Sequence, residues 1–309
     1  MADGSTQARA TWAAPASAAV AGEDRAAEAR HIGARRVFRS RGVWMGSAIL
    51  AGVLAMAVGA PWLTGYDPMR VDVANRLLAP SAAHFFGTDE FGRDVYSLTL
   101  YGSRISLVVG ASVMLLTSIA GVVMGLLAGY FRSLENLLMR IADGLMAFPA
   151  IVLAIAFMAS LGPRVSNIII ALTIVYMPRT ARITYGAVLV ARELSYVEAA
   201  RAAGARDVRV AFLHILPNCL APLVVQGTFI FAYAVLAEAT LSFLGVGAPP
   251  YIPSWGNVIN AGGKLITEAP WIALFPAMAI TVTGLGLNLL GDALHDALDP
   301  RLRGLERPR

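Results

Sequence analysis

Apolar residues occur in long runs along this chain, and shorter polar stretches separate the runs. A helix needs about 20 consecutive apolar residues to cross the hydrocarbon of a bilayer. Six runs reach roughly that length, and they predict transmembrane helices at residues 43–63, 105–130, 141–161, 168–190, 220–244 and 271–290. We therefore expect an all-α membrane protein with six transmembrane helices.

The composition supports a membrane location and argues against a metal centre. The chain is 57% hydrophobic and 15% charged, whereas about 25% of the residues in a soluble protein carry charge. Its single cysteine, Cys219, excludes an internal disulfide and a cysteine metal cluster. The four histidines lie far apart in sequence, so no histidine metal site and no metal ligands are predicted.

The placement of basic residues predicts that both termini lie in the cytoplasm. In that orientation the inner segments contain Arg35, Arg36, Arg39, Arg41, Arg132, Arg140, Arg192, Arg201, Arg206, Arg209, Arg301, Arg303, Arg307 and Arg309. The outer segments contain Arg70, Arg76, Arg93, Arg104, Arg164 and Lys264. This bias follows the positive-inside rule. It also explains a pI of about 9.6 without a nucleic-acid partner.

The pattern divides the chain into five parts. Residues 1–42 are rich in Ala, Ser and Gly and are expected to form a disordered cytoplasmic tail. The first transmembrane helix, 43–63, is too long for a cleaved signal peptide. An extracytoplasmic segment, 64–104, precedes a five-helix core, 105–291, which contains a cytoplasmic loop at 193–217. A cytoplasmic tail, 292–309, ends the chain.

The stretch "YVEAARAAGA" predicts a short soluble helix inside the cytoplasmic loop. Ser195 is a plausible N-cap, with Glu198 completing a capping box, and Gly204 suits a left-handed C-cap. A second short helix is expected from Asp207 to Leu216, ending at Pro217. This hairpin is either an ordinary interfacial connection or a rigid knob that enters a groove on a partner protein. We favour the second interpretation because a simple connector does not need defined ends.

Polar residues within the apolar runs are candidates for the pathway or for helix contacts, because charge in a membrane is costly. Glu238 is expected to face a substrate ammonium or a partner subunit, and Asn288 lies in the sixth run. Asp143 follows Arg140 by three residues and is expected to form an ion pair with it on one helix face. Asp292 is expected near the cytoplasmic interface.

Proline and glycine positions predict two further features of the helices. Pro149, together with Phe148, should kink the third helix. Gly121, Gly125 and Gly129 recur every four residues and predict close packing of the second helix against a neighbour.

No motif for catalysis is present in the sequence. Asp89, Arg93 and Asp94 in "FFGTDEFGRDV" predict a salt-bridge network that pins an outer loop, since no nucleophile or base accompanies the carboxylates. The stretch "NAGGKL" lacks the glycine spacing and the hydroxyl residue of a P-loop. The chain is therefore expected to have no catalytic residues and no ATPase site.

Five stretches together resemble a known transporter family. "YVEAARAAGARDVRVAFLHILPN" closely resembles the EAA loop of ABC-importer permeases. The permease of the dipeptide/oligopeptide/nickel importer family with the shorter outer segment, the C-type permease subunit, is similar in four more stretches. These are "FFGTDEFGRDVYSLTLYGSRISLVVG", "RIADGLMAFPAIVLAIA", "EATLSFLGVGAPPYIPSWGNVI" and "NLLGDALHDALDPRLRG". Two departures are Leu213, where relatives often carry arginine, and the run Leu285-Gly286-Leu287.

This resemblance implies a type I ABC importer permease fold in the cytoplasmic membrane. It implies that the EAA helix is a coupling helix seated in a cytosolic ATPase. The implied coupling residues are Glu198, Ala199, Ala200, Gly204, Ala205, Leu216 and Pro217. The implied partners are a second homologous permease, two ABC ATPases that bind ATP and Mg, and an extracytoplasmic substrate-binding protein. That protein would contact Asp89, Arg93 and Asp94, while Glu238, Phe148 and Asn288 would lie at the pathway or between the permeases.

The implied solute is a dipeptide or an oligopeptide. A nickel complex or glutathione is the alternative within the same family. An ATP-independent secondary carrier is less favoured, because the sequence shows no inverted repeat and no broken helices with ion-binding groups. An intramembrane enzyme lacks any catalytic motif.

Overall fold

The computed structural model describes residues 40–298, and this part of the chain contains helices and no strands, as predicted. Of the predicted tails, 1–42 and 292–309, residues 1–39 and 299–309 lie outside the described residues. The described part corrects both bounds, because α2 already begins at Arg41 and α11 continues to Leu298. The helices are α2 (Arg41–Leu63), α3 (Val95–Tyr130), α4 (Arg132–Met146), α5 (Ala150–Leu161), α6 (Val165–Ala191), α7 (Ser195–Ala202), α8 (Asp207–Arg209), α9 (Leu216–Phe243), α10 (Trp255–Gly263) and α11 (Trp271–Leu298).

Four helical stretches of the described chain are long and apolar enough to cross a membrane. They are Arg41–Leu63, Val95–Tyr130, Asp207–Phe243 and Trp271–Ala297, and the bent pair α4 and α5 would make a fifth. Helix α6 is not among them. The count of six spans and the cytoplasmic location of both termini therefore stay predictions.

Helix α3 begins at Val95, although the apolar run predicted a start at residue 105. Asp94 caps the helix, since its Oδ2 accepts a hydrogen bond of 2.7 Å from the Ser97 backbone N–H. Ser97, Thr99 and Ser103 of this first part are buried and hydrogen-bonded, so they can lie in a helix without an apolar pattern. The outer segment that precedes α3 is correspondingly shorter than predicted.

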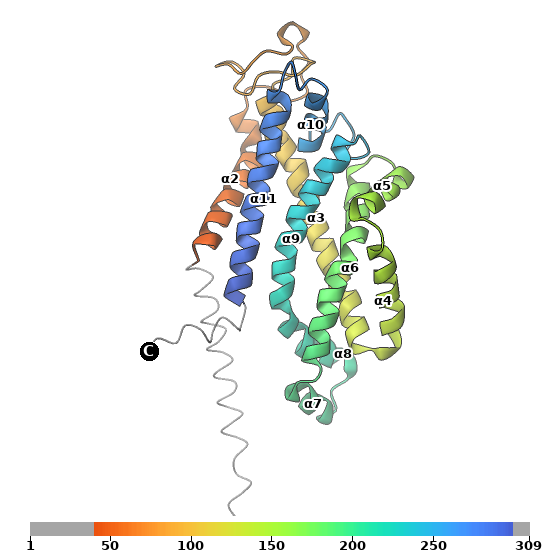
Figure 1. Cartoon of the computed structure of the whole chain (residues 1–309). Coiled ribbons are helices and arrows are strands. Elements are labelled where there is room, and N and C mark those ends of the chain that lie inside the picture. Colours follow the sequence, from red (N-terminus) through yellow and green to blue (C-terminus); the bar gives the residue numbers. More distant parts are fainter. Residues whose placement is uncertain (1–39, 299–309) are drawn as a thin grey trace, which may run out of the picture.

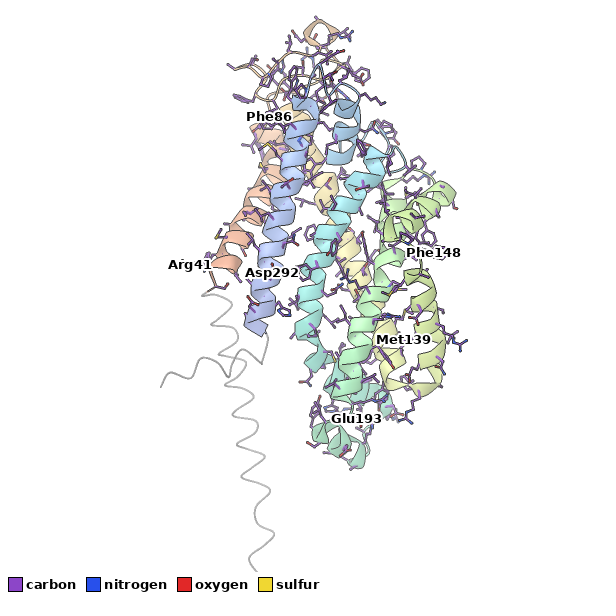
Figure 2. All side chains as sticks on the ribbon, viewed as in Figure 1. Arg41, Phe86, Met139, Phe148, Glu193 and Asp292 are labelled. Carbon is purple, nitrogen blue, oxygen red and sulfur yellow. The ribbon has the colours of Figure 1, made fainter. Side chains whose placement is uncertain are left out.

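The third apolar run forms two helices instead of one kinked helix. Helices α4 and α5 meet at an angle of 93° around Ala147, Phe148 and Pro149, and Figure 2 shows Phe148 at this corner. Proline lacks the backbone N–H of a helix interior and disfavours the helical conformation of the residue before it. The proline was correctly expected to bend the helix, but it ends one helix and begins the next.

Helix α6 contains two arginines, Arg179 and Arg182, in its second half. Arg182 forms a salt bridge with Asp143 of α4. The predicted partner of Asp143, Arg140, is therefore wrong. A partner from another helix could not be inferred from spacing along one helix.

The helices are arranged around α3, which runs the length of the bundle (Figure 1). Helices α2 and α11 lie together on one side, and α4 and α5 lie on the other. The segment before α3 and helix α10 cover one end of the bundle, called the outer end after its predicted location, whereas α7 projects at the opposite end. Trp271 attaches the outer segment to α11, because its indole N–H donates to the Thr88 carbonyl at 3.2 Å.

Helices α3 and α6 approach closely along the three glycines that recur every four residues. A Cβ added at Gly121 would lie 2.6 Å from the Thr180 Cβ, and one at Gly129 would lie 2.7 Å from Val188 Cγ1. At Gly125 an added Cβ would overlap with the Ala181 carbonyl oxygen. The predicted close helix contact is confirmed, and α6 is the neighbour.

Glu238 lies in the core near the outer end of the bundle. Its side chain is fully buried. Its carboxylate accepts hydrogen bonds from the hydroxyls of Ser106 on α3 (2.9 Å) and Ser242 on α9 (2.8 Å), and also from Ser254, the cap of α10. None of the ion pairs of residues 40–298 includes Glu238. The serine hydroxyls therefore stabilise the carboxyl group and join three helices.

Replacing Gly125 by alanine should destabilise the protein by about 1–3 kcal/mol, because the added methyl group forces two backbones apart. The matched control is Gly52→Ala on α2, where an added Cβ has no atom within 4 Å. The control should leave the unfolding temperature in detergent unchanged or slightly higher. Equal midpoints for the two variants would contradict the close contact.

Glu238→Gln should be tolerated, because an amide of the same shape can still bond with serine hydroxyls. Glu238→Leu should cost about 1–3 kcal/mol, because buried hydroxyls lose their partner. Thermal unfolding of the two purified variants checks the difference. If Glu238→Gln lowered the unfolding temperature as much as Glu238→Leu, the protein would need a negative charge at this position. Hydrogen bonds with the serine hydroxyls would then not be sufficient to explain the role of Glu238.

Candidate functional site

Helix α7 lies at the end of the bundle opposite α10, between α6 and α8, and Figure 2 shows Glu193 just before it. The helix begins at Ser195, and Leu194 is the residue before its first turn. The Leu194 carbonyl accepts the Val197 N–H at 2.9 Å, and no side chain caps this end. The predicted Ser195 cap and its capping box with Glu198 are therefore wrong by one residue.

The other end of α7 has the predicted glycine stop. Gly204 has φ +81°, a left-handed conformation that side chains with a Cβ disfavour. Beside it, the Ala205 N–H donates to the Ala200 carbonyl at 3.1 Å, which is the pattern of a glycine-terminated helix. An added Cβ at Gly204 would meet no atom within 4 Å, so backbone conformation alone favours glycine here.

The chain after α7 forms one long helix, not the predicted separate short one. α8 continues through a π-helical segment, Val210–Ile215, into α9. The predicted end of the helix at Pro217 is wrong, because Pro217 lies within this continuous helix, where the π-helical segment passes into α9. Asp207 is the first residue of α8 and makes no capping hydrogen bond there.

Helix α7 is fixed to the bundle along one side. Val197 is fully buried in a cluster with Leu126 of α3, Val188 of α6 and Ile215. Ala200, Ala205 and Leu216 border the same cluster and are partly buried. These predicted coupling residues therefore support the helix from inside, and apolar burial holds α7 in place.

The remaining predicted coupling residues face outward. Glu198, Ala199, Gly204 and Pro217 are exposed, and the Glu198 side chain makes no hydrogen bond within residues 40–298. Large apolar side chains surround the slim helix, with Val208 62% and Leu213 63% exposed. A narrow ridge between exposed apolar residues can fit into a groove on another protein.

Polar contacts fasten the same region, and sequence reasoning missed them. The Tyr130 hydroxyl at the end of α3 donates to Asp207 Oδ1 at 2.6 Å. Arg192 Nη1 donates to the Gly129 carbonyl at 2.8 Å. The partners lie 63 or more residues apart, so no local pattern indicated these bonds.

A further contact joins α7 to the start of α9. The Asn218 amide donates to the Tyr196 hydroxyl oxygen at 3.0 Å. Burial raises the pKa of the Tyr196 phenol, so the hydroxyl stays protonated at neutral pH.

The three residues predicted for the pathway or the permease interface do not come together. Glu238 is fully buried within this chain, so its predicted contact with a substrate or a partner is not found. Phe148 is 60% exposed at the corner between α4 and α5, and Asn288 is exposed on α11. Only the last two remain available to another molecule.

The predicted salt-bridge network of the outer segment is present. Arg93 Nε donates to Asp89 Oδ2 at 2.7 Å, and the other carboxylate oxygen accepts two backbone N–H groups at 2.9 Å. Asp94 Oδ1 lies 3.0 Å from His84 Nδ1. Both carboxylates are buried, at 1% and 4% exposed. They hold the loop, so a direct contact with a binding protein would fall to their neighbours.

No group of three or more His, Cys, Asp or Glu side chains in the described part of the chain is arranged to hold a metal ion. The exposed residues of α7, together with its exposed apolar neighbours, form the candidate site, a protein-docking surface.

Comparison with known proteins places the chain in a family. Residues 121–304 match the binding-protein-dependent transport system inner membrane component family, and residues 31–80 match the N-terminal TM domain of oligopeptide transport permease C. A Brucella suis protein named as a permease of a peptide transport system is 52% identical over 270 residues, which cover 87% of this chain and 91% of the relative.

Two other relatives have more specific names. The dipeptide transport system permease protein of Alkalihalophilus pseudofirmus is 43% identical over 84% of this chain and 86% of its own length. The glutathione transport system permease protein of Pectobacterium atrosepticum is 41% identical over 83% of this chain and 87% of its own length. The family match and these identities show that the chain belongs to the inner membrane permease components of binding-protein-dependent ABC transport systems.

Proposed function

We propose that this chain is a transmembrane subunit of an ATP-driven importer for dipeptides or oligopeptides. Relatives named for peptide and dipeptide transport support the solute class. The observation that carries the mechanism is the exposed, slim helix α7, which is buried on one side and ends at a left-handed glycine. When a partner protein displaces such a helix, the helix can move as a rigid body and displace the helices attached to it.

The connections of α7 give the push a route into the membrane. Helix α6 ends at Ala191, just before α7, and the helical stretch Asp207–Phe243 follows it. Closure of two ATPase subunits on ATP would move α7, and both attached helices would tilt with it. Alternating access needs such an element with two positions whose balance a ligand shifts.

ATP and Mg would bind in the partner ATPases and not in this chain. The glycines and lysine of "NAGGKL" lie at the end of α10, near the outer end of the bundle. Here Lys264 follows a short helix, whereas a P-loop places its lysine at the start of a helix that follows a strand. We propose that this chain contributes coupling residues and no catalytic ones.

The complete machine would contain a second homologous permease, two ATPase subunits and an extracytoplasmic binding protein. The outer surface formed by α10 and the segment before α3 is the proposed contact for the binding protein. Arg93 belongs to this surface, and its side chain is held in place by Asp89. Phe148 and Asn288 are the exposed residues proposed to meet the pathway or the second permease.

Ala199→Trp should abolish solute uptake and ATPase attachment, because a bulky side chain widens an exposed ridge that must enter a groove. Ala199→Ser is the matched control and should keep both, since it adds a single oxygen. Uptake by membrane vesicles and co-purification of the ATPase measure the outcome. Normal uptake by the tryptophan variant, with normal amounts of protein in the membrane, would refute the coupling role.

Glutathione is the second candidate solute, because one relative is named for it. Competition separates the two: unlabelled dipeptides should reduce the uptake of a labelled dipeptide by the assembled importer, whereas glutathione should not. Titration of the purified binding protein with both solutes provides an independent measurement. Preference for glutathione in both assays would replace the peptide assignment and leave the coupling mechanism intact.

A further inference from the structure

Helix α3 is not adjacent in sequence to α7 and the residues that flank it, the coupling region, because α4, α5 and α6 lie between them. Its last two residues nevertheless contact that region at three points. Arg192, just before α7, donates to the Gly129 carbonyl at 2.8 Å. The guanidinium of Arg201, in the last turn of α7, lies over the Tyr130 ring, 5.2 Å from its centroid. Asp207, just after α7, accepts the Tyr130 hydroxyl at 2.6 Å. The end of α3 is thus held before, within and after α7.

Among the described residues, the bodies of α3 and α6 meet through close packing, without a side-chain hydrogen bond from one helix to the other. The glycine contact is made by van der Waals packing, and the buried hydroxyls of Thr117 and Thr180 have no hydrogen-bond partner. Thr184 donates back to the carbonyl of Thr180 within its own helix. Thr180, Thr184 and Val188 fit against the glycines of α3, and the bonds at the end of α3 add polar contacts that join it to the coupling region.

At its other end α3 is bonded to the outer part of the protein. The buried indole of Trp255, the first residue of α10, donates to the Thr99 carbonyl at 2.9 Å. Ser106 donates to Glu238, which also bonds with the cap of α10. A helix of 36 residues is about 54 Å long at 1.5 Å per residue. One rigid element therefore joins the coupling region to the outer helix.

We propose that Tyr130 is a positioning residue that transmits the displacement of α7 to α3. Its hydroxyl holds Asp207 and its ring supports Arg201, so α3 moves together with α6 and α9 when α7 is pushed. The movement then reaches α10 through Trp255 and Ser106. This proposal rests on the coupling function proposed above, and it adds a third driven helix that the chain connectivity does not supply.

The test compares Tyr130→Phe with a matched control in the same chain. Tyr185 on α6 donates to Glu135 of α4 at 2.6 Å, which is a second tyrosine–carboxylate bond that does not involve α7. The assembled importer is reconstituted in vesicles, and a labelled dipeptide moved per ATP hydrolysed is measured. Tyr130→Phe should lower this ratio about fivefold, the scale of one lost hydrogen bond, with ATPase attachment unchanged. Tyr185→Phe should leave the ratio unchanged.

A double-mutant cycle tests whether the effect belongs to the bond. Asp207→Ala should resemble Tyr130→Phe, and the combined variant should be no worse than either one, because both remove the same contact. Asp207→Asn keeps an acceptor for the hydroxyl and should restore most of the ratio. Additive losses, or an equal loss in Tyr185→Phe, would overturn the proposal.

A distance measurement tests the proposal without any solute. Spin labels at Ala202 of α7 and Val108 of α3, both in exposed positions, are introduced after Cys219→Ser. In the wild-type background their separation should stay constant when the complex is trapped with nucleotide, whereas it should change in Tyr130→Ala. A separation that changes equally in both backgrounds would overturn the proposal.

The two proposals fail in different ways. A wild-type complex that moves no dipeptide would reject the proposed solute, and the spin-label distances would still decide the role of Tyr130. If Tyr130→Phe moved as much dipeptide per ATP as the wild type, only the proposed role of Tyr130 would be rejected. Uptake in Ala199→Trp would reject coupling through α7 itself.

Discussion

The structure depends on the close approach of α3 and α6 along Gly121, Gly125 and Gly129. Apolar burial drives helix association only weakly in a bilayer, so helices associate there through close packing and hydrogen bonds. A side chain at any of these glycines would push the backbones apart. Because α3 and α6 meet here, α4 can pack against both, and the cluster around Leu126 and Val188 can form beneath them to hold α7.

Polar groups at both ends of the bundle bond with partners from other elements. At the outer end the Glu238 carboxyl group accepts bonds from serines of three segments, and Arg104 donates to the carbonyl of Ala57 on α2. At the other end Arg192 and Asp207 bond with the last two residues of α3. An unsatisfied polar group in an apolar interior is costly, so these bonds restrict how the helices can be placed as well as stabilising them.

Hydropathy, glycine and proline predicted the parts of the fold that depend on local pattern. The apolar runs gave the long helices, the glycine repeat gave a close contact, and Gly204 gave the end of α7. Two predictions failed because they depended on residues elsewhere: Asp143 binds an arginine from another helix, and Glu238 binds Ser106, 132 positions away in sequence. The predicted start of α3 failed for a local reason, because the cap at Asp94 lies within a polar stretch.

In the candidate site, too, local features could be predicted from the sequence and long-range contacts could not. The exposed ridge of α7 could be read from the sequence, because alanines and a glycine stop act within ten residues. The tie from Tyr130 could not, because Tyr130 ends an apolar run and is followed by Phe131, so it reads as an ordinary interfacial aromatic residue. Only the fold brings its hydroxyl to Asp207, which lies 77 positions later.

Rigid and weakly held parts lie side by side in this chain, and this contrast bears on how it would move. Helices α3, α6 and α7 are joined by close packing and by bonds at their ends. Helix α5, in contrast, begins after a proline and ends at Gly162, with φ +85°. Its buried side chains, Ala154 and Met158, make apolar contacts. Apolar contacts can shift without leaving a polar group unpaired, so displacement of the rigid part can repack α5 near Phe148, whereas the Asn167 amide of α6 holds the other end of α5 by donating to the Leu161 carbonyl at 2.7 Å.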